Sequence, residues 1–385
     1  MTDSPSPPAR ALLDKGALGA LLDALRRRGH DLIGPTLRDG AIMLDPIDGI
    51  DALPAGIGDD QAPGRYRLRA REDGARFGHT VGPASIKREL FVPSLRLFQI
   101  RRSASGLAIE IDPPPSRKIA FVGARACDLA AIAVLDRVLL GGPMVDTDYA
   151  ARRKDLFVLA VHCAEPGGTC FCASQGTGPT ATAGFDLALT ELCGGAGPSP
   201  RYVVEVGTEA GAALLAEVHA PEASADDRAL AEAQHAAAIA KMGRSLDTAG
   251  LRDLLARNLD HPRWEDIASR CLGCANCTLV CPTCFCSTVE DRTDLEGALA
   301  ERVRRYDSCF TLDHAYIHGG SVRPSLAARY RQWLTHKLSS WFDQFGTSGC
   351  VGCGRCITFC PVGIDITAEA AAIRAADGKG ARPST

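Results

Sequence analysis

Two copies of one cysteine pattern constrain this chain more than any other feature. The pattern C-x2-C-x2-C-x3-C-P occurs at Cys271–Pro282 and again at Cys350–Pro361. Three thiols separated by two residues each lie on a tight loop around one centre. The fourth, three residues further on at the start of a short helix, points away from that centre. Any fold of the chain must therefore accommodate two metal-binding loops separated by 67 residues.

This spacing is typical of bacterial ferredoxins, in which the fourth cysteine of each copy binds the other [4Fe-4S] cluster. Zinc is disfavoured because zinc sites pair two C-x2-C knuckles. Disulfides are disfavoured because the chain shows no export signal. The predicted ligand sets are Cys271, Cys274, Cys277 and Cys360 for cluster 1, and Cys350, Cys353, Cys356 and Cys281 for cluster 2.

Composition excludes several functional classes. The net charge of −3 and the dispersed Lys and Arg residues give no basic surface for nucleic acid. The N-terminal residues lack a secretion or twin-arginine signal, and no run approaches the roughly twenty apolar residues of a membrane span. We therefore expect a cytoplasmic protein without a membrane span, in which closely spaced cysteines indicate metal or redox chemistry.

The predicted fold class is α+β, with an N-terminal mixed β and α/β part followed by an α-helical ferredoxin domain with two clusters. A leading helix is expected at 11–28, and strands at 65–70 and 95–100. The predicted regions are an irregular, mainly β region at 1–115, an α/β cysteine-bearing domain at 116–213, a helical connector at 214–260, the ferredoxin domain at 261–371 and a disordered tail at 372–385.

A strand–helix–strand unit within the α/β domain suggests a third cluster. The strands begin near Lys118 and Asp155, and the helix begins at Asp128. Four cysteines near the two strand ends could converge at one sheet edge, and the helix dipole there favours a thiolate at the first of them. Small core thiols and a zinc site remain the alternatives. The four residues are Cys127, Cys163, Cys170 and Cys172.

The segment between the two motifs is too long for a compact ferredoxin. Helices are expected at 264–270, before the first motif, and at 294–305 and 325–342 within the insert. The arrangement resembles the α-helical ferredoxin module of the iron–sulfur subunits of succinate dehydrogenase and heterodisulfide reductase. Packing, alternative ligation and redox activity all remain open for the three further thiols near the clusters, which are Cys284, Cys286 and Cys309.

Other polar residues in this region have less specific interpretations. The histidines at 314, 318 and 336 are interpreted as helix-surface or capping residues, because lone histidines are more often these than ligands. Arg355, inside the second motif, is a candidate for raising the potential of the nearest cluster, or else a surface arginine. Cys193 has no second cysteine at ligand spacing and is interpreted as a packed or half-exposed thiol.

Motifs for substrate chemistry are absent from the sequence. It contains no strand-linked G-x-G-x-x-G, Walker A, G-x-S-x-G or H-E-x-x-H pattern. We therefore predict a chain that carries electrons and has no catalytic residues or substrate site of its own.

Several runs together resemble one protein family. These are Gly123-Ala-Arg-Ala-Cys-Asp-Leu-Ala-Ala-Ile, Cys170-Phe-Cys-Ala-Ser-Gln-Gly-Thr-Gly-Pro, Phe185-Asp-Leu-Ala-Leu-Thr, Cys281-Pro-Thr-Cys-Phe-Cys and Arg323-Pro. They resemble the β (iron–sulfur) subunit of cytosolic NAD(P)-linked [NiFe] hydrogenases, or sulfhydrogenases. The electron-transfer subunit of anaerobic sulfite reductase shares the pattern. The resemblance extends from about 81 to 372.

The resemblance implies a multi-subunit oxidoreductase complex. The implied partners are a flavin subunit that binds NAD(P) and the small and large [NiFe] hydrogenase subunits, with this chain relaying electrons between them. The first alternative is the same role in an anaerobic sulfite reductase. The second is a cluster-bearing scaffold or sensor, which is disfavoured because no DNA-binding motif or output domain is seen.

Overall fold

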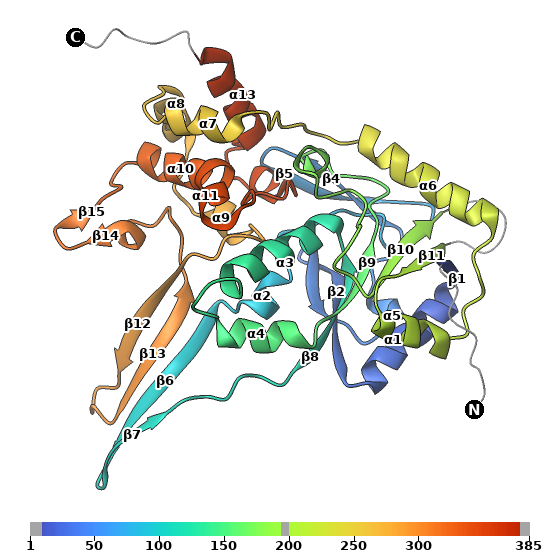
Figure 1. The fold of residues 1–385 in the computed structure, drawn as a ribbon, viewed down its shortest axis with the longest axis horizontal. Coiled ribbons are helices and arrows are strands. Elements are labelled where there is room, and N and C mark those ends of the chain that lie inside the picture. Colours follow the sequence, from blue (N-terminus) through green and yellow to red (C-terminus); the bar gives the residue numbers. More distant parts are fainter. Residues whose placement is uncertain (1–9, 194–199, 378–385) are drawn as a thin grey trace.

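The computed structural model describes residues 10–193 and 200–377. Its largest element is a mixed seven-stranded sheet, whose four central strands β10, β9, β8 and β2 run parallel (Figure 1). The outer strands pair antiparallel. In spatial order the strands are β1 (Arg10–Leu13), β11 (Arg201–Val206), β10 (Leu187–Leu192), β9 (Phe157–Val161), β8 (Lys118–Ala124), β2 (His30–Arg38) and β3 (Ala41–Pro46).

Helices cover both faces of this sheet, because its central strands are apolar on both sides. Alternate residues of β9 belong to two different cores: Leu159 packs with α1 and α5, whereas Val158 packs with α3 and α4. The fold is therefore α+β, as predicted. The covering helices are α1 (Lys15–Arg27), α2 (Lys87–Leu90), α3 (Ala126–Leu139), α4 (Thr147–Lys154), α5 (Glu209–Glu217) and α6 (Ala225–Ala240).

The leading helix is shorter than predicted. Residues 10–13 form an edge strand, and Asp14 begins α1 by accepting a hydrogen bond from the Ala17 N–H at 2.8 Å. At the other end of the chain, α13 extends to Ala376, past the start of the predicted tail at 372. The rest of the predicted disordered tail, at 378–385, lies outside the described ranges.

The dicluster region is built from short helices around a separate apolar core. Trp264, Trp333 and Ile357 lie in this core. The predicted helices at 264–270 and 325–342 are present, the second interrupted by a π-helical turn at His336–Ser340. The helices are α7 (Leu251–Arg257), α8 (Arg263–Arg270), α9 (Asn276–Leu279), α10 (Leu326–Thr335), α11 (Trp341–Phe345), α12 (Arg355–Thr358) and α13 (Ile366–Ala376).

The predicted helix at 294–305 is wrong, because this segment forms a β hairpin. Strands β12 (Ser287–Thr293) and β13 (Leu299–Tyr306) turn at Gly297, which has φ +66°. Strand β13 also pairs with β6 (Ser94–Ser103), which pairs with β7 (Gly106–Glu110). The resulting four-stranded sheet projects from the body of the molecule (Figure 1). The insert is therefore joined to the N-terminal region by strand pairing.

A hairpin of β4 (Ile57–Ala62) and β5 (Arg65–Ala70) connects the N-terminal region to the second cysteine motif. Gln61 accepts a hydrogen bond from the Thr358 hydroxyl at 2.8 Å, and Thr358 contacts the Thr169 hydroxyl at 2.6 Å. The Gly64 N–H donates to the Ile357 carbonyl at 3.1 Å. These buried contacts hold α12, and with it the second motif, against two segments far away in sequence.

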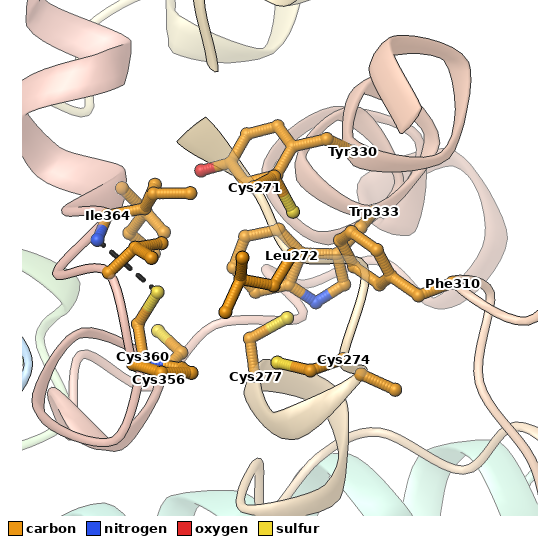
Figure 2. A pocket seen from close by; sticks show the side chains of 14 residues that line it. Cys271, Leu272, Cys274, Cys277, Phe310, Tyr330, Trp333, Cys356, Cys360 and Ile364 are labelled. Atoms are coloured by element: carbon orange, nitrogen blue, oxygen red, sulfur yellow. Dashed lines mark hydrogen bonds between the residues drawn. The ribbon is translucent and has the colours of Figure 1, made fainter. Parts of the chain in front are cut away.

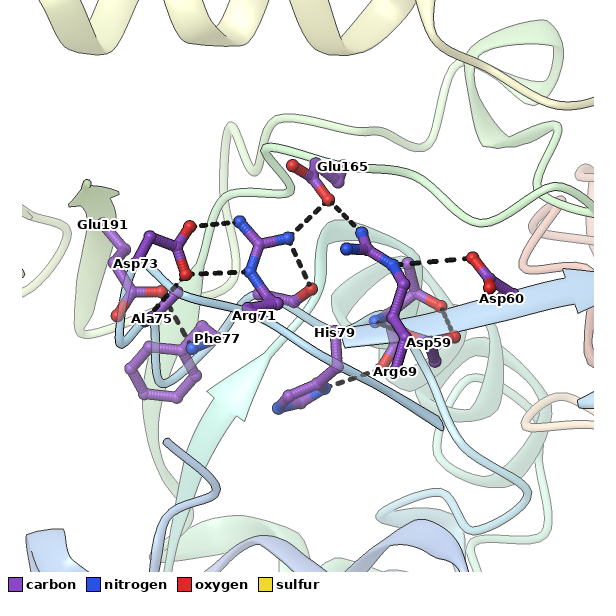
Figure 3. A network of polar contacts seen from close by, with 12 residues as sticks. Asp59, Asp60, Arg69, Arg71, Asp73, Ala75, Phe77, His79, Glu165 and Glu191 are labelled. Atoms are coloured by element: carbon purple, nitrogen blue, oxygen red, sulfur yellow. Dashed lines mark hydrogen bonds and ion pairs between the residues drawn. The ribbon is translucent and has the colours of Figure 1, made fainter. Parts of the chain in front are cut away.

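An ionic network holds the same hairpin to the loop after β9. Arg69 and Arg71 both donate to one oxygen of Glu165, at 2.7 and 2.6 Å, and Arg71 also pairs with Asp73 (Figure 3). Glu165 lies between Cys163 and Cys170 in sequence. The network therefore positions the loop that carries three of the four cysteines of the predicted third cluster.

No helix in residues 10–193 and 200–377 is long and apolar enough to cross a membrane.

Candidate iron–sulfur site

The first cysteine motif lines a cavity beneath α10 (Figure 2). Its loop follows α8, which ends at Arg270, and leads into α9. Aromatic side chains close the other side of the cavity. The cysteines that line it are Cys271, Cys274, Cys277, Cys356 and Cys360. All four residues of the predicted first set therefore lie around one space, with Cys360 supplied by the second motif.

Backbone N–H groups point at several of the sulfurs. The Gly273 N–H donates to Cys271 Sγ at 3.4 Å, and the Gly352 N–H donates to Cys350 Sγ at 3.4 Å. The Ile364 N–H donates to Cys360 Sγ at 3.3 Å (Figure 2). Such bonds stabilise thiolate charge, which a cluster requires of its ligands. The two motif loops repeat the same contact because their spacing is the same.

Two polar atoms beside the first cavity suit a cofactor that accepts hydrogen bonds. The Tyr330 hydroxyl and the Trp333 indole N–H are buried without a hydrogen-bond partner among the described residues. Both side chains line the cavity (Figure 2). Buried donors normally have a partner, and the sulfides of a cluster can accept such bonds. The residues present therefore fit a [4Fe-4S] group.

The second predicted set is also brought together. Burial raises the pKa of Cys350 to about 12, and the neighbouring Cys353 and Cys281 act in the same direction. The pKa of the Cys356 thiol is raised well above its usual value, first by burial and then by Cys350, Cys353 and Cys281. These mutual effects place the four sulfurs near one another, with Cys281 supplied by the first motif.

Lys337 is the cation next to this second set. Its ammonium donates to Cys281 Sγ at 3.3 Å and to the Gly349 carbonyl at 3.1 Å, and it is buried. The Cys284 thiol, Lys337 and Lys87 together hold the pKa of Cys281 well below its usual value. Sequence reasoning missed this contact, because Lys337 lies on the predicted helix at 325–342 with no local pattern to distinguish it.

Arg355 is buried at 1% exposure, which excludes the surface interpretation. Its Nη2 atom lies 2.9 Å from Asp128 Oδ1, and its Nε donates to the Gly82 carbonyl at 2.9 Å. Its Nη1 has no hydrogen-bond partner among the described residues, and its charge lowers the pKa of the neighbouring Cys353 thiol, which burial raises. A buried cation therefore lies beside each of two cysteines of the second set.

The four cysteines of the predicted third cluster lie beside the second motif. The Cys170 thiol contacts the Cys353 carbonyl at 3.8 Å, and the Phe171 N–H donates to the Gly352 carbonyl at 2.8 Å. Cys127 and Cys172 pack with Cys353 in one apolar cluster. Cys163 lies close enough for its charge to raise the pKa of Cys172, which burial raises first, to about 12.

Burial opposes the effect of the helix dipole on the pKa of Cys127. Cys127 is the second residue of α3, and burial raises its pKa well above the usual value, with Asp128 and Cys353 acting in the same direction. Desolvation outweighs the dipole because the side chain lies under the second motif rather than at the surface.

In the described part of the chain, no three Cys, His, Asp or Glu side chains come together in a way that could hold a single metal ion. The thiolates of a cubane surround four irons, so they are spread more widely than the ligands of one ion.

The remaining thiols in this region are not merely packed around the motifs. Cys284 neighbours Cys281, and Cys286 neighbours Cys309 and His314, each close enough to shift the pKa of the other. His314 is partly buried and pairs with Asp307 rather than lying free on the surface of a helix. The structure places it between a cysteine and Asp307, an arrangement that only the pairing of β12 with β13 creates.

Comparisons with known proteins agree with this geometry. Residues 270–364 match the family of 4Fe-4S dicluster domains. The chain is 38% identical over 252 residues to the sulfhydrogenase 2 subunit beta of Pyrococcus furiosus, a match that covers 64% of this chain and 72% of that protein. No solved structure matches the chain.

Proposed function

Because this chain belongs to the sulfhydrogenase β-subunit family, we propose that it is the iron–sulfur electron-transfer subunit of a cytoplasmic [NiFe] hydrogenase complex. It relays electrons between a flavin subunit that binds NAD(P) and the small and large hydrogenase subunits. The observation that carries the proposal is the exchange of cysteines between the two motifs, since Cys360 lines the cavity of the first motif. Two centres built in this way share ligating segments and lie close together.

The ligand assignment follows from this exchange. Cys271, Cys274, Cys277 and Cys360 hold cluster 1, and the second set, Cys350, Cys353, Cys356 and Cys281, holds cluster 2. Each cluster, when bound, carries one electron at a time. The chain's own residues supply the thiolates, the N–H donors at the sulfurs, the buried cations Lys337 and Arg355, and aromatic walls that exclude water.

The test of this role uses the complex purified anaerobically from its native cells. Nickel in the complex and hydrogen-dependent reduction of NAD(P) are the expected results. Sirohaem absorption with sulfite reduction, and no nickel, would instead assign the chain to an anaerobic sulfite reductase. If the loaded chain transfers no electron from a low-potential donor to any acceptor, the relay is refuted and a scaffold or sensor role remains.

A third [4Fe-4S] cluster at Cys127, Cys163, Cys170 and Cys172 extends this proposal. Its support is that Cys127, Cys170 and Cys172 lie beside Cys353, and that Cys163 lies near Cys170 and Cys172. The measurement is iron and acid-labile sulfide per chain, with Cys170→Ser and the exposed Cys193→Ser as its matched control. About twelve irons, falling to about eight only in Cys170→Ser, are expected, whereas about eight in every variant would refute the third cluster.

A further inference from the structure

The base of the β12–β13 hairpin brings together two cysteines that neither predicted cluster uses. Cys286 immediately precedes β12, and Cys309 lies shortly after the end of β13. Ser287 pairs with Tyr306, and the Asp307 N–H donates to the Cys286 carbonyl at 2.9 Å. The two cysteines are therefore neighbours because the hairpin closes, although 22 residues separate them in sequence.

The two thiols have opposite environments. The neighbouring Cys309 and His314 lower the pKa of Cys286 below its usual value, although burial acts in the opposite direction. Cys309 shows the complementary effect: its contact with Cys286, together with burial, raises its pKa. Cys286 is partly exposed, whereas Cys309 is buried. One sulfur is therefore a reachable thiolate and the other a protected thiol.

His314 is held in place by Asp307. Its Nδ1 lies 3.1 Å from Asp307 Oδ2, so its other ring nitrogen faces Cys286. Asp307 also accepts hydrogen bonds from the Thr311 hydroxyl at 2.6 Å and the Ser308 N–H at 2.7 Å. A nucleophile beside an imidazole that a carboxylate orients is the arrangement of activated cysteines. Contact with Cys286 raises the pKa of His314, so the ring can hold a proton next to the sulfur.

Other charged or titratable groups also act on this pair. Lys87, whose ammonium binds the Cys281 and Cys284 carbonyls, lies close enough to Cys286 for its charge to favour the Cys286 thiolate. Cys284 lies between Cys281 and Cys286 in sequence and contacts the former. The charge of Cys277, from the first motif, acts on Cys309. The pair is therefore adjacent to both predicted clusters.

We propose that Cys286 and Cys309 form a redox-active dithiol that reduces small disulfides. The Cys286 thiolate attacks one sulfur of the disulfide R–S–S–R, forming a Cys286–S–S–R bond and releasing RS⁻, which takes a proton from His314. Cys309 passes its proton to solvent and then attacks Cys286 Sγ, forming the Cys286–Cys309 disulfide and releasing the second RS⁻, which takes a proton from solvent. Two protein thiols are oxidised and one small disulfide is reduced to two thiols.

Return to the dithiol requires two electrons and two protons. This step rests on the proposed function, because reduced [4Fe-4S] clusters on this chain supply the electrons one at a time. The attack on the disulfide does not depend on it. The thiol chemistry can therefore be tested without partner subunits, and its outcome is separate from that of the hydrogenase assay.

The experiment treats the full-length, cluster-loaded chain anaerobically with oxidised glutathione and maps every cysteine by differential alkylation and peptide mass spectrometry. Trypsin places Cys286 in the peptide 271–292 and Cys309 in the peptide 306–329, where it is the one cysteine. The expected product is a disulfide between these peptides at Cys286 and Cys309, with unchanged iron content. The matched control Cys193→Ser, at an exposed cysteine, should form it equally well.

The Cys309→Ser variant gives a positive signal that needs a folded site. It should accumulate glutathione on Cys286, because the resolving thiol is missing, whereas Cys286→Ser should accumulate none at Cys309. In the Cys309→Ser background, the pH at half-maximal rate should rise by at least about one unit when His314 is changed to Asn, toward the usual value of about 8.5. A merely structural role of His314 would leave this pH unchanged.

Three results would overturn the proposal. The first is no Cys286–Cys309 disulfide in the unsubstituted chain at saturating oxidised glutathione. The second is glutathione on a cysteine other than Cys286 in the Cys309→Ser variant. The third is protection of both thiols from alkylation together with extra iron or zinc that is lost in Cys286→Ser, which would identify them as metal ligands.

Discussion

Replacing Arg355 by Met should be among the most destabilising single changes in the dicluster region. The guanidinium is 1% exposed and pairs with Asp128, which is 3% exposed, at 2.9 Å. Methionine is an unbranched side chain that can fill much of the same space, but it leaves a buried carboxylate without its cation and the Gly82 carbonyl without its donor. Breaking one side of a buried pair costs about 3–5 kcal/mol, and most of this cost is the unpaired charge.

A double-mutant cycle separates the charge from the packing. Asp128→Asn keeps an oxygen for the Arg125 N–H, which lies 3.1 Å from the carboxylate and caps α3. In the Arg355→Met background the charge to be relieved is already unpaired, so Asp128→Asn should cost little or restore stability. The coupling energy should therefore be about 2–3 kcal/mol.

The assay is anaerobic urea unfolding of the cluster-loaded chain, monitored by tryptophan fluorescence. The free energies of unfolding of the variants are compared using one shared m-value. Arg252→Met, which breaks a solvent-exposed pair with Asp343, is the control and should leave the urea midpoint unchanged. A loss below about 1 kcal/mol for Arg355→Met, or strictly additive effects of the two substitutions, would refute the reasoning.

Three further predictions concern the surroundings of the clusters. Gly64→Ala places a methyl group on a residue with φ +68°, 3.0 Å from the Cys360 carbonyl. It should therefore reduce the iron content and destabilise the chain by more than the roughly 1–2 kcal/mol that a left-handed backbone costs a non-glycine residue. Gly40→Ala, with φ +71° and open space around it, should show this backbone cost alone in the same urea assay. Burial lowers the pKa of His79 to about 3. The stability that neutral His79 contributes is therefore complete above the unfolded pKa of about 6.5 and decreases as the pH falls, with a loss of about 2.7 kcal/mol at a pH of about 4.5. His79→Gln should make the urea stability nearly independent of pH between about 4.5 and about 6.5, and an unchanged pH dependence would contradict the assignment to His79. Lys337→Gln removes the cation that lies 3.3 Å from Cys281 Sγ and should lower the midpoint potential of one cluster by about 60 mV, equivalent to about 1.4 kcal/mol, in a redox titration followed by electron paramagnetic resonance. Lys87→Gln should lower the potential less, because the Lys87 ammonium binds carbonyls rather than a sulfur. Equal shifts in the two variants would show that contact with the sulfur is unimportant.

The structure brings together residues whose proximity the spacing of the cysteines along the chain predicts. The two motifs place Cys360 beside the first loop, as the crossing of ligands requires. The strand–helix–strand unit at 118–161 is also present, since its strands are short apolar runs with a helix of suitable length between them. Each motif and each of these strands and helices can be recognised within a short stretch of sequence.

The hairpin in the insert could not be predicted in the same way. Residues 294–305 contain the good helix formers Leu, Ala, Glu and Arg, so their propensity favours a helix. They form a strand because β6, far earlier in the chain, offers a pairing edge on one side and β12 on the other. Strand formation depends on such neighbours more than on intrinsic preference.

The polar residues around the clusters escape sequence-based prediction for a related reason. Lys337, Asp128 and His314 have no distinguishing neighbours in sequence, and each acquires its contact with a sulfur or with Arg355 only when distant segments meet. A cysteine at ligand spacing is recognisable from the sequence alone, whereas the residue that tunes its charge is not.

The hydrogen bonds of Gln61, Thr169 and Thr358 have a consequence for how the chain is made. During synthesis the second motif leaves the ribosome well after the β4–β5 hairpin and the loop after β9. Those earlier segments supply the surface on which α12 docks. Insertion of cluster 2 is therefore expected to depend on prior folding of the N-terminal region.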